Sequence, residues 1–142
     1  MENEHSIVKW TVLPRGDGAR WSGMYVTLNS IGKIALSHTT HERIGSPAAV
    51  LIMYDPMRSL LALRPAQLHE QNAYPLRKYG TCRGRIIRAY RLLTEFGIKP
   101  TETVEFIEPK IDNDGQLILN LRDIRVSRRA EGWKRRREER AY

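Results

Sequence analysis

The stretch that decides the fold is VTLNSIGKIAL at residues 26–36, because a shorter version of it, TCRGRII, returns at residues 81–87. The two versions share a glycine, a basic residue and an isoleucine, as Gly32–Ile34 and as Gly84–Ile86. Internal repetition changes what counts as one folding unit. We therefore expect two halves, each too short to bury much apolar surface alone, to fold around one shared core. The alternative is that the two stretches resemble each other by chance.

Both versions continue into a short helix that ends at a glycine. Ser37 is suited to cap the start of the first helix, and Gly45 stands where a helix C-terminus favours glycine. The second helix is expected over residues 88–96, followed by Gly97. Its apolar residues recur at i, i+3, i+4 and i+7, which predicts one buried face. The residues of this face are Ala89, Leu92, Leu93 and Phe96.

Apolar runs bounded by turn signals predict the strands. We expect them at residues 7–12, 24–28, 33–36, 50–54, 60–63, near 79, and at 85–87, 104–108 and 116–121. A glycine turn is expected at 112–115, and a short connecting helix at 66–71. The predicted fold class is mainly β with short helices, in two βαββ-type halves.

The predicted organisation follows from the repeat. The parts are an N-terminal strand extension at 1–22, a first half at 23–65, a linker at 66–76, a second half at 77–122 and a basic C-terminal tail at 123–142. Residues 22–122 are expected to form one structural domain. From Arg125 onward the tail has strong helix formers but only Trp133 as a large apolar anchor, so a marginal helix is the most that we expect there.

The composition is that of an ordinary soluble globular protein. The chain has 142 residues, of which 41% are hydrophobic and 28% charged. No apolar run approaches the ~20 residues that span a bilayer. The polar, acidic first residues do not look like a secretory signal. Cys82 is the single cysteine, which excludes an intrachain disulfide and fits a reducing cytosol. We expect a cytoplasmic protein and no membrane partner.

The charge balance favours a polyanionic partner. The chain has 24 Lys and Arg against 16 Asp and Glu, a net charge of +8, and each phosphate that such a protein neutralises releases a condensed counterion. Residues 122–142 hold nine basic and four acidic residues, a net +5. This tail is either a solvated extension or a nucleic-acid contact. The candidate tail contacts are Arg128, Arg129, Lys134, Arg135, Arg136 and Arg137.

The order of strand, glycine-basic turn, strand, short helix and apolar hairpin resembles the AbrB/SpoVT/MazE family of swapped-hairpin β-barrels. The match covers Gly23 to Pro65 in the first half and about Arg77 to Leu121 in the second. Two such halves in one chain are similar to the tandem arrangement of MraZ proteins. The resemblance implies that the halves interleave their hairpins into one double-psi-like or AbrB-like barrel, a pseudo-dimer within a single chain.

The sequence departs from that family pattern at the turns. MraZ-type turns carry an aspartate four residues before an arginine. Here these positions hold Asn29 and Lys33 in the first half, and Thr81 and Arg85 in the second. Asparagine can cap a turn as aspartate does, but lysine cannot form the bidentate fork of arginine. The proline that usually begins the family helix is absent from both halves.

The resemblance implies a DNA-facing side made of the first hairpin turns and of the basic residues next to the helices. By position it implies roles for Lys33, His41, Arg43, Lys78 and Arg85. A twisted hairpin with cationic tips can follow phosphates and enter a groove. For each residue the alternative is a solvated surface charge. Independently of the family, three nearby arginines make the second half basic, namely Arg83, Arg88 and Arg91.

The sequence gives little support to catalysis. Cys82 lies among arginines, which can lower a thiol pKa, but spacing identifies no base to activate it. The histidines at 5, 38, 41 and 69 do not form a set with metal-ligand spacing. No cofactor, metal or catalytic residue is expected.

We therefore expect a nucleoid-associated DNA-binding protein, a transcriptional regulator or antitoxin-type autoregulator, that contacts duplex DNA with basic turns. A homo-oligomer is expected, because repeating the basic face multiplies weak contacts. The alternative is a basic module that binds RNA or a protein partner mainly through its tail. A small enzyme that uses Cys82 is the third hypothesis.

Overall fold

The computed structural model describes residues 10, 23–78 and 83–127, and its described part is mainly β with two short helices. In the first half the elements are β1 (Val26–Leu28), β2 (Lys33–Leu36), α2 (His38–Arg43), β3 (Ala49–Asp55) and β4 (Leu60–Ala66). Two short strands follow, β5 (Tyr74–Pro75) and β6 (Arg77–Lys78). The second half has β7 (Arg85–Arg88), α3 (Tyr90–Glu95), β8 (Val104–Phe106), β9 (Lys110–Ile111), β10 (Leu117–Asn120) and β11 (Ile124–Val126).

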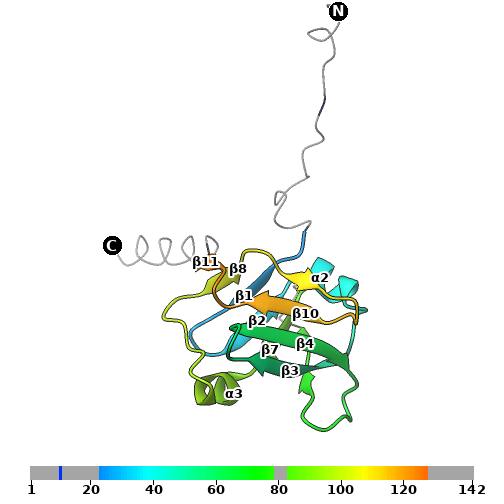
Figure 1. Ribbon diagram of the computed structural model, residues 1–142. Helices are drawn as coiled ribbons and strands as arrows, with labels where there is room; N and C mark the ends of the chain where they lie inside the picture. The colour runs from blue at the N-terminus through cyan, green and yellow to red at the C-terminus, as the bar shows by residue number, and fades with distance from the viewer. Residues whose placement is uncertain (1–9, 11–22, 79–82, 128–142) are drawn as a thin grey trace, which may run out of the picture.

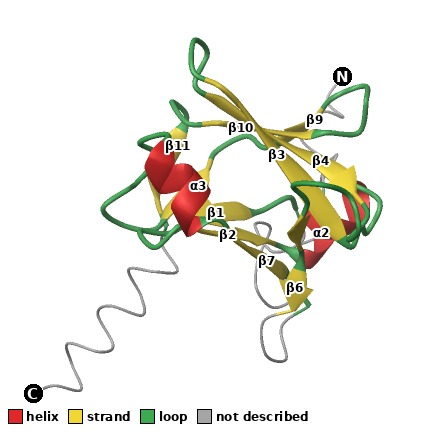
Figure 2. Ribbon diagram, turned by 90° about the horizontal axis from the view of Figure 1, so that it is seen from below, coloured by secondary structure: helices red, strands yellow, loops and turns green. Residues whose placement is uncertain are grey.

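The strands form two antiparallel sheets. One has six strands in the order β11-β8-β1-β2-β7-β6, and the other has five in the order β5-β3-β4-β10-β9. Figures 1 and 2 show the two sheets as two layers, with α2 and α3 at opposite sides of the molecule. Among the described strands no ladder joins one sheet to the other, so the sheets do not close into a single barrel.

Each sheet contains a ladder that pairs the first half with the second. In the six-stranded sheet β2 pairs with β7, which places Ile34 opposite Ile87. In the five-stranded sheet β4 pairs with β10, which places Leu61 opposite Leu119. These four side chains are at most 1% exposed and belong to one core cluster. The core therefore combines apolar side chains from both halves.

Both helices end in the same way. Gly45 and Gly97 have φ of 92° and 73°, the left-handed conformation that glycine adopts without strain. In each helix, the N–H of the glycine donates to the carbonyl three positions earlier. The N–H of the residue that follows the glycine donates to the carbonyl five positions before itself. This is the Schellman motif. At the start of α2, the Ser37 hydroxyl accepts a hydrogen bond from the Thr40 N–H, which confirms the predicted cap.

The matched glycines lie where one half crosses the other. Gly32 has φ of 71°, and a Cβ at this position would collide with the backbone of Tyr90. A Cβ on Gly84 would lie 2.6 Å from the carbonyl oxygen of Leu36. The turn of the first half therefore contacts the start of the second half's helix. The turn of the second half contacts the chain just before the first half's helix. Both glycines are explained by close backbone approach rather than by sequence pattern alone.

The second helix differs from its prediction at both ends. It begins at Tyr90 rather than at residue 88, because Arg85–Arg88 pair with β2 as strand β7. Phe96 is 53% exposed although its spacing predicted burial. It lies past the last helical residue, and its ring meets that of Tyr54 edge-on at 5.7 Å between centroids. By contrast Leu93 is buried as expected.

The connecting helix at 66–71 does not form. Instead β4 continues to Ala66, and two turns follow, in which Glu70 N–H donates to the carbonyl of Gln67 and Ala73 N–H to that of Glu70. The Glu70 carboxylate also accepts from the Gln67 N–H. Polar side chains that bond the local backbone compete with helix formation, and this stretch has little apolar surface to pack in return.

The predicted tail at 123–142 begins in a strand. Residues 124–126 form β11, which pairs with β8, so this part of the tail belongs to the folded sheet. The strand was not predicted, because it is only three residues long and all three are exposed. The strand expected near 79 corresponds to β6 at Arg77–Lys78, which pairs with β7. The helix expected from Arg125 onward is wrong at its start, because Arg125 and Val126 belong to β11. The rest of that helix, apart from Ser127, and the strand expected at 7–12, apart from Trp10, lie outside the described residues.

Candidate nucleic-acid interface

Basic residues lie opposite one another in two adjoining ladders of the six-stranded sheet. In the β2–β7 ladder Lys33 lies opposite Arg88, and in the β6–β7 ladder Lys78 lies opposite Arg85. Lys78 and Arg88 are exposed, whereas Lys33 and Arg85 are half-buried. Like charges directly opposite each other destabilise a sheet. The strands thus bring basic residues from different parts of the chain to adjacent positions.

The two matched cations of the repeat do not lie on one side of the sheet. Residues opposite each other share a face, and successive residues alternate between faces. Lys33 therefore shares a face with Arg88, whereas Arg85 shares the other face with Leu36 and Lys78. The symmetric pair expected from the sequence is thus replaced by two basic pairs at opposite ends of the β2–β7 ladder.

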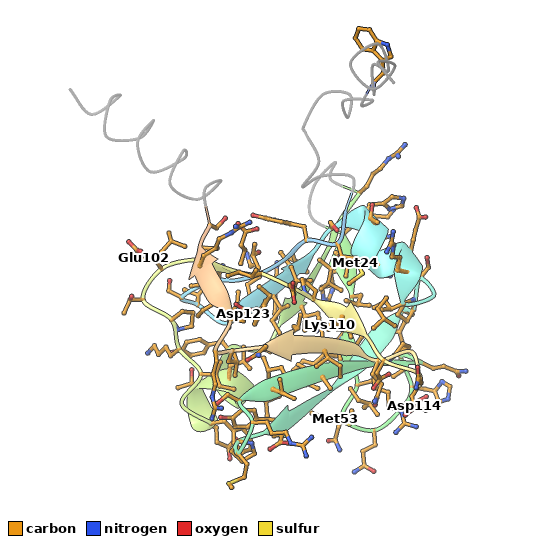
Figure 3. The ribbon with its side chains drawn as sticks, turned by 45° about the horizontal axis from the view of Figure 1, so that its top comes forward. Met24, Met53, Glu102, Lys110, Asp114 and Asp123 are labelled. Carbon is orange, nitrogen blue, oxygen red and sulfur yellow. The ribbon has the colours of Figure 1, made fainter. Side chains whose placement is uncertain are left out.

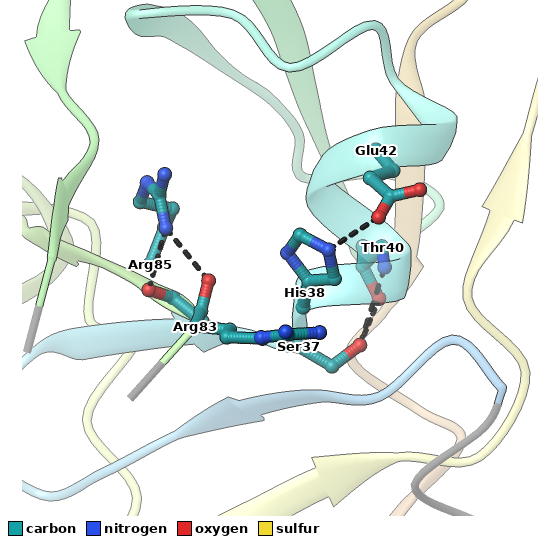
Figure 4. Close-up of polar contacts among 7 residues, drawn as sticks. Ser37, His38, Thr40, Glu42, Arg83 and Arg85 are labelled. Atoms are coloured by element: carbon teal, nitrogen blue, oxygen red, sulfur yellow. Dashed lines mark hydrogen bonds and ion pairs between the residues drawn. The ribbon is translucent and has the colours of Figure 1, made fainter. Parts of the chain in front are cut away.

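The Arg85 guanidinium makes hydrogen bonds to the backbone of its own turn. Its Nη1 donates to the carbonyl of Arg83 at 2.6 Å and to that of Gly84 at 3.1 Å. Figure 4 shows this turn beside the start of α2, where the His38 imidazole pairs with the Glu42 carboxylate. A guanidinium that holds its own turn can still offer its remaining N–H groups to an anion. This end of the ladder therefore combines cations with one exposed carboxylate.

His41 is not placed to contact DNA. It is 5% exposed, and its Nε2 lies 2.8 Å from the carbonyl oxygen of Pro47, so the ring ties α2 to the loop before β3. The role that the family resemblance implied for His41 is not supported by this burial. Arg43 on α2 and Arg91 on α3 are exposed, on helices at opposite sides of the molecule.

Several of the exposed cations have no acidic partner within the described part of the chain. Among the residues that the structure describes, no carboxylate forms an ion pair with Arg77, Lys78, Arg83 or Arg88. Arg77 was not in the predicted set, although it precedes Lys78 in the exposed edge strand β6. Elsewhere Arg125 donates to the buried Glu105 at 2.8 Å across the β8–β11 pair. That arginine is therefore engaged in holding the sheet edge.

The sequence did not point to Tyr90 and Lys99. Tyr90 is 48% exposed, and Lys99 Nζ lies 5.8 Å from the centroid of its ring, within the range of a cation–π interaction. Nothing in the spacing of these two residues predicted the contact, because Lys99 reaches the ring from the loop after α3.

Other predicted site residues cannot be placed. The tail contacts at Arg128, Arg129 and 134–137, and also Cys82, lie outside the described residues. Within 23–78 and 83–127, no three His, Cys, Asp or Glu side chains gather as a metal site would require. In that same part of the chain, no helix has the length and apolar character needed to cross a membrane.

Comparisons with protein-family models, with curated proteins and with solved structures found no match to this chain.

Proposed function

We propose that the chain is a DNA-binding protein that contacts duplex phosphates through cations at the two ends of the β2–β7 ladder. The observation that carries this proposal is that cation lies opposite cation in two adjoining ladders, Lys33 with Arg88 and Lys78 with Arg85. Neighbouring cations on paired strands raise the local positive potential, and a phosphate is the kind of group that such a potential attracts. The net charge of +8 acts in the same direction.

The proposed architecture is an AbrB-like tandem, in which two hairpin-bearing halves interlock as a pseudo-dimer. Two features support it: the ladders that pair the halves with each other, and the contact of each glycine turn with the other half near its helix. In such an arrangement the cationic turns are held by the fold rather than hanging from flexible loops. Regulation of transcription, a nucleoid location and a homo-oligomeric state belong to this proposal.

A paired charge reversal tests the proposed interface. Lys78→Glu combined with Arg88→Glu should weaken binding of a labelled DNA duplex at low salt by about ten-fold or more, since each position changes from attracting to repelling phosphate. Both residues are exposed, so the fold should tolerate the changes. The matched control is Lys110→Glu, at a 73% exposed lysine on the edge strand of the other sheet. Equal binding by the double variant and the control would contradict the proposal.

The tail provides the competing explanation. If truncation after Ser127 abolishes binding while the double variant binds normally, the tail and not the sheet is the nucleic-acid contact. If the truncated chain still binds and the double variant does not, the proposed interface holds.

A further inference from the structure

We propose that Tyr90 is a stacking platform for an unpaired nucleobase, so that the α3 side of the molecule binds single-stranded nucleic acid. The inference rests on the proposed function in one respect: it uses two residues that we also assign to duplex phosphates, Arg88, two positions before Tyr90, and Lys33, next to the Gly32 that meets the Tyr90 backbone. It goes beyond that function because an exposed aromatic ring stacks on bases that are not already stacked in a duplex.

The fold fixes the position of the ring. Tyr90 is the first residue of α3, and its backbone packs so closely on Gly32 that only glycine fits there. The preceding Ala89 N–H donates to the Gly32 carbonyl at 2.9 Å. These contacts involve the Tyr90 backbone and Cβ, whereas the residue as a whole is 48% exposed. The ring is therefore held at the turn while much of its surface remains open to solvent.

One cation lies against the ring, and two more are close to its backbone along the chain. Lys99 Nζ lies 5.8 Å from the ring centroid. Lys33 and Arg88 adjoin Gly32 and Ala89 along the chain and lie opposite each other in the β2–β7 ladder. Sites for single strands combine such cations, which follow the backbone, with aromatic faces on which bases stack. The cations thus suit the phosphate of a nucleotide, and the ring suits its base.

None of the ion pairs among the described residues involves a residue of α3. Glu95 is at the opposite end of α3 from Tyr90. Figure 3 places Glu102 toward β8 and β11, and Asp114 at the far side of the molecule from α3. No described carboxylate pairs with Arg88 or Lys99. Arg88 and Lys99 are therefore not neutralised by an ion pair within the described part of the chain.

The corresponding place in the first half is chemically different. His38 is the first residue of α2, as Tyr90 is of α3, but its imidazole pairs with Glu42 one turn later. Four residues after Tyr90 the chain has Thr94 instead of a carboxylate. The two helix starts thus carry an imidazole in contact with a carboxylate in one half, and an exposed aromatic residue in contact with Lys99 in the other. Only the second fits a base.

The test measures binding to labelled single strands of about 12 nucleotides, one of DNA and one of RNA, and to a duplex of the same DNA sequence. Tyr90→Ala should weaken single-strand binding by about five-fold or more and change duplex binding by less than two-fold. Tyr90→Phe should restore single-strand affinity, because the ring stacks and the hydroxyl is not required. His38→Ala is the matched control and should leave single-strand binding unchanged. The DNA and RNA arms show which nucleic acid is preferred.

The outcomes separate this inference from the proposed function. Binding of duplex without binding of either single strand overturns the inference and leaves the proposed function standing. The inference also fails if single-strand binding survives Tyr90→Ala, or falls equally with His38→Ala. Absence of binding to the duplex and to both single strands overturns both. Loss confined to Tyr90→Ala, with rescue by Tyr90→Phe, supports the inference.

Discussion

Gly32 shows how one residue can carry information about a distant part of the chain. Its φ of 71° alone would favour glycine, but Gly97 has nearly the same φ, 73°, and faces open space. What distinguishes Gly32 is that a methyl group there would meet the backbone of Tyr90 in the other half. The residue is needed for the contact between halves as well as for the turn.

Comparing alanine at these two glycines measures that contact. Gly97→Ala should lower the free energy of unfolding by about 1–2 kcal/mol, the cost of a left-handed alanine. Gly32→Ala should lower it by about 2–5 kcal/mol, because a steric clash with backbone adds to the same strain. Urea denaturation followed by circular dichroism gives both values. Equal losses would mean that the turn does not press against α3.

The Ser37 cap illustrates a residue with several partners. Its hydroxyl oxygen accepts from the Thr40 N–H at 3.2 Å and also from the Tyr25 N–H at 3.2 Å. Ser37→Ala should therefore lower the free energy of unfolding by about 1–2 kcal/mol. Ser37→Asn, which can still cap a helix, should recover part of this loss. A loss below a few tenths of a kcal/mol in the alanine variant, again by urea denaturation, would show that the cap contributes little.

At the scale of elements, the β9–β10 turn has a built-in dependence on pH. The hydrogen bonds from the Gln116 side chain and backbone N–H, at 2.8 and 2.9 Å, lower the pKa of the Asp112 carboxyl below its ordinary value. A smaller contribution in the same direction comes from the Asp114 N–H. The ionised carboxylate thus holds the turn by accepting from several donors.

The sign of the pH effect follows from that lowered pKa. The stabilisation by Asp112 should be fully present above the carboxyl's pKa in the unfolded chain, and should be lost as the pH falls through its lower pKa in the folded protein. Gln116→Ala removes the side-chain donor and should raise the pKa of Asp112. An NMR titration of the Asp112 carboxyl in both proteins checks this. An unchanged titration midpoint would show that Gln116 does not stabilise the charge.

Much of the local structure could be predicted from sequence. The Ser37 cap, the glycines that end both helices and the hairpin at 50–63 follow from backbone chemistry and apolar alternation, which act over a few residues. The burial of His41 and the exposure of Phe96 could not be predicted, because both depend on packing between elements.

For the candidate site, sequence identified the basic strands but not their faces. The match of Lys33 with Arg85 suggested a symmetric pair, yet which residues share a face is set by the register between strands that are distant in sequence. Only the β2–β7 ladder shows that Lys33 lies beside Arg88 instead.

At the scale of the whole molecule, the two halves should unfold together. Leu61 and Leu119, from different halves, lie opposite each other at the centre of one sheet, and each is at most 1% exposed. Leu61→Ala and Leu119→Ala should each lower the free energy of unfolding by about 2–5 kcal/mol. Each variant should still show one cooperative transition, with coincident hydrogen-exchange protection in both halves. A second transition in either variant would show that the halves are independent folding units.

The central claim is that cations on the β2, β6 and β7 strands bind duplex phosphates, and the salt dependence of DNA affinity tests it most directly. The logarithm of the affinity should fall linearly with the logarithm of the salt concentration. The Lys78→Glu, Arg88→Glu double variant should show a slope shallower by about 2, roughly one per lost phosphate contact, while Lys110→Glu keeps the original slope. Identical slopes for all three proteins would contradict the claim that these strands contact DNA.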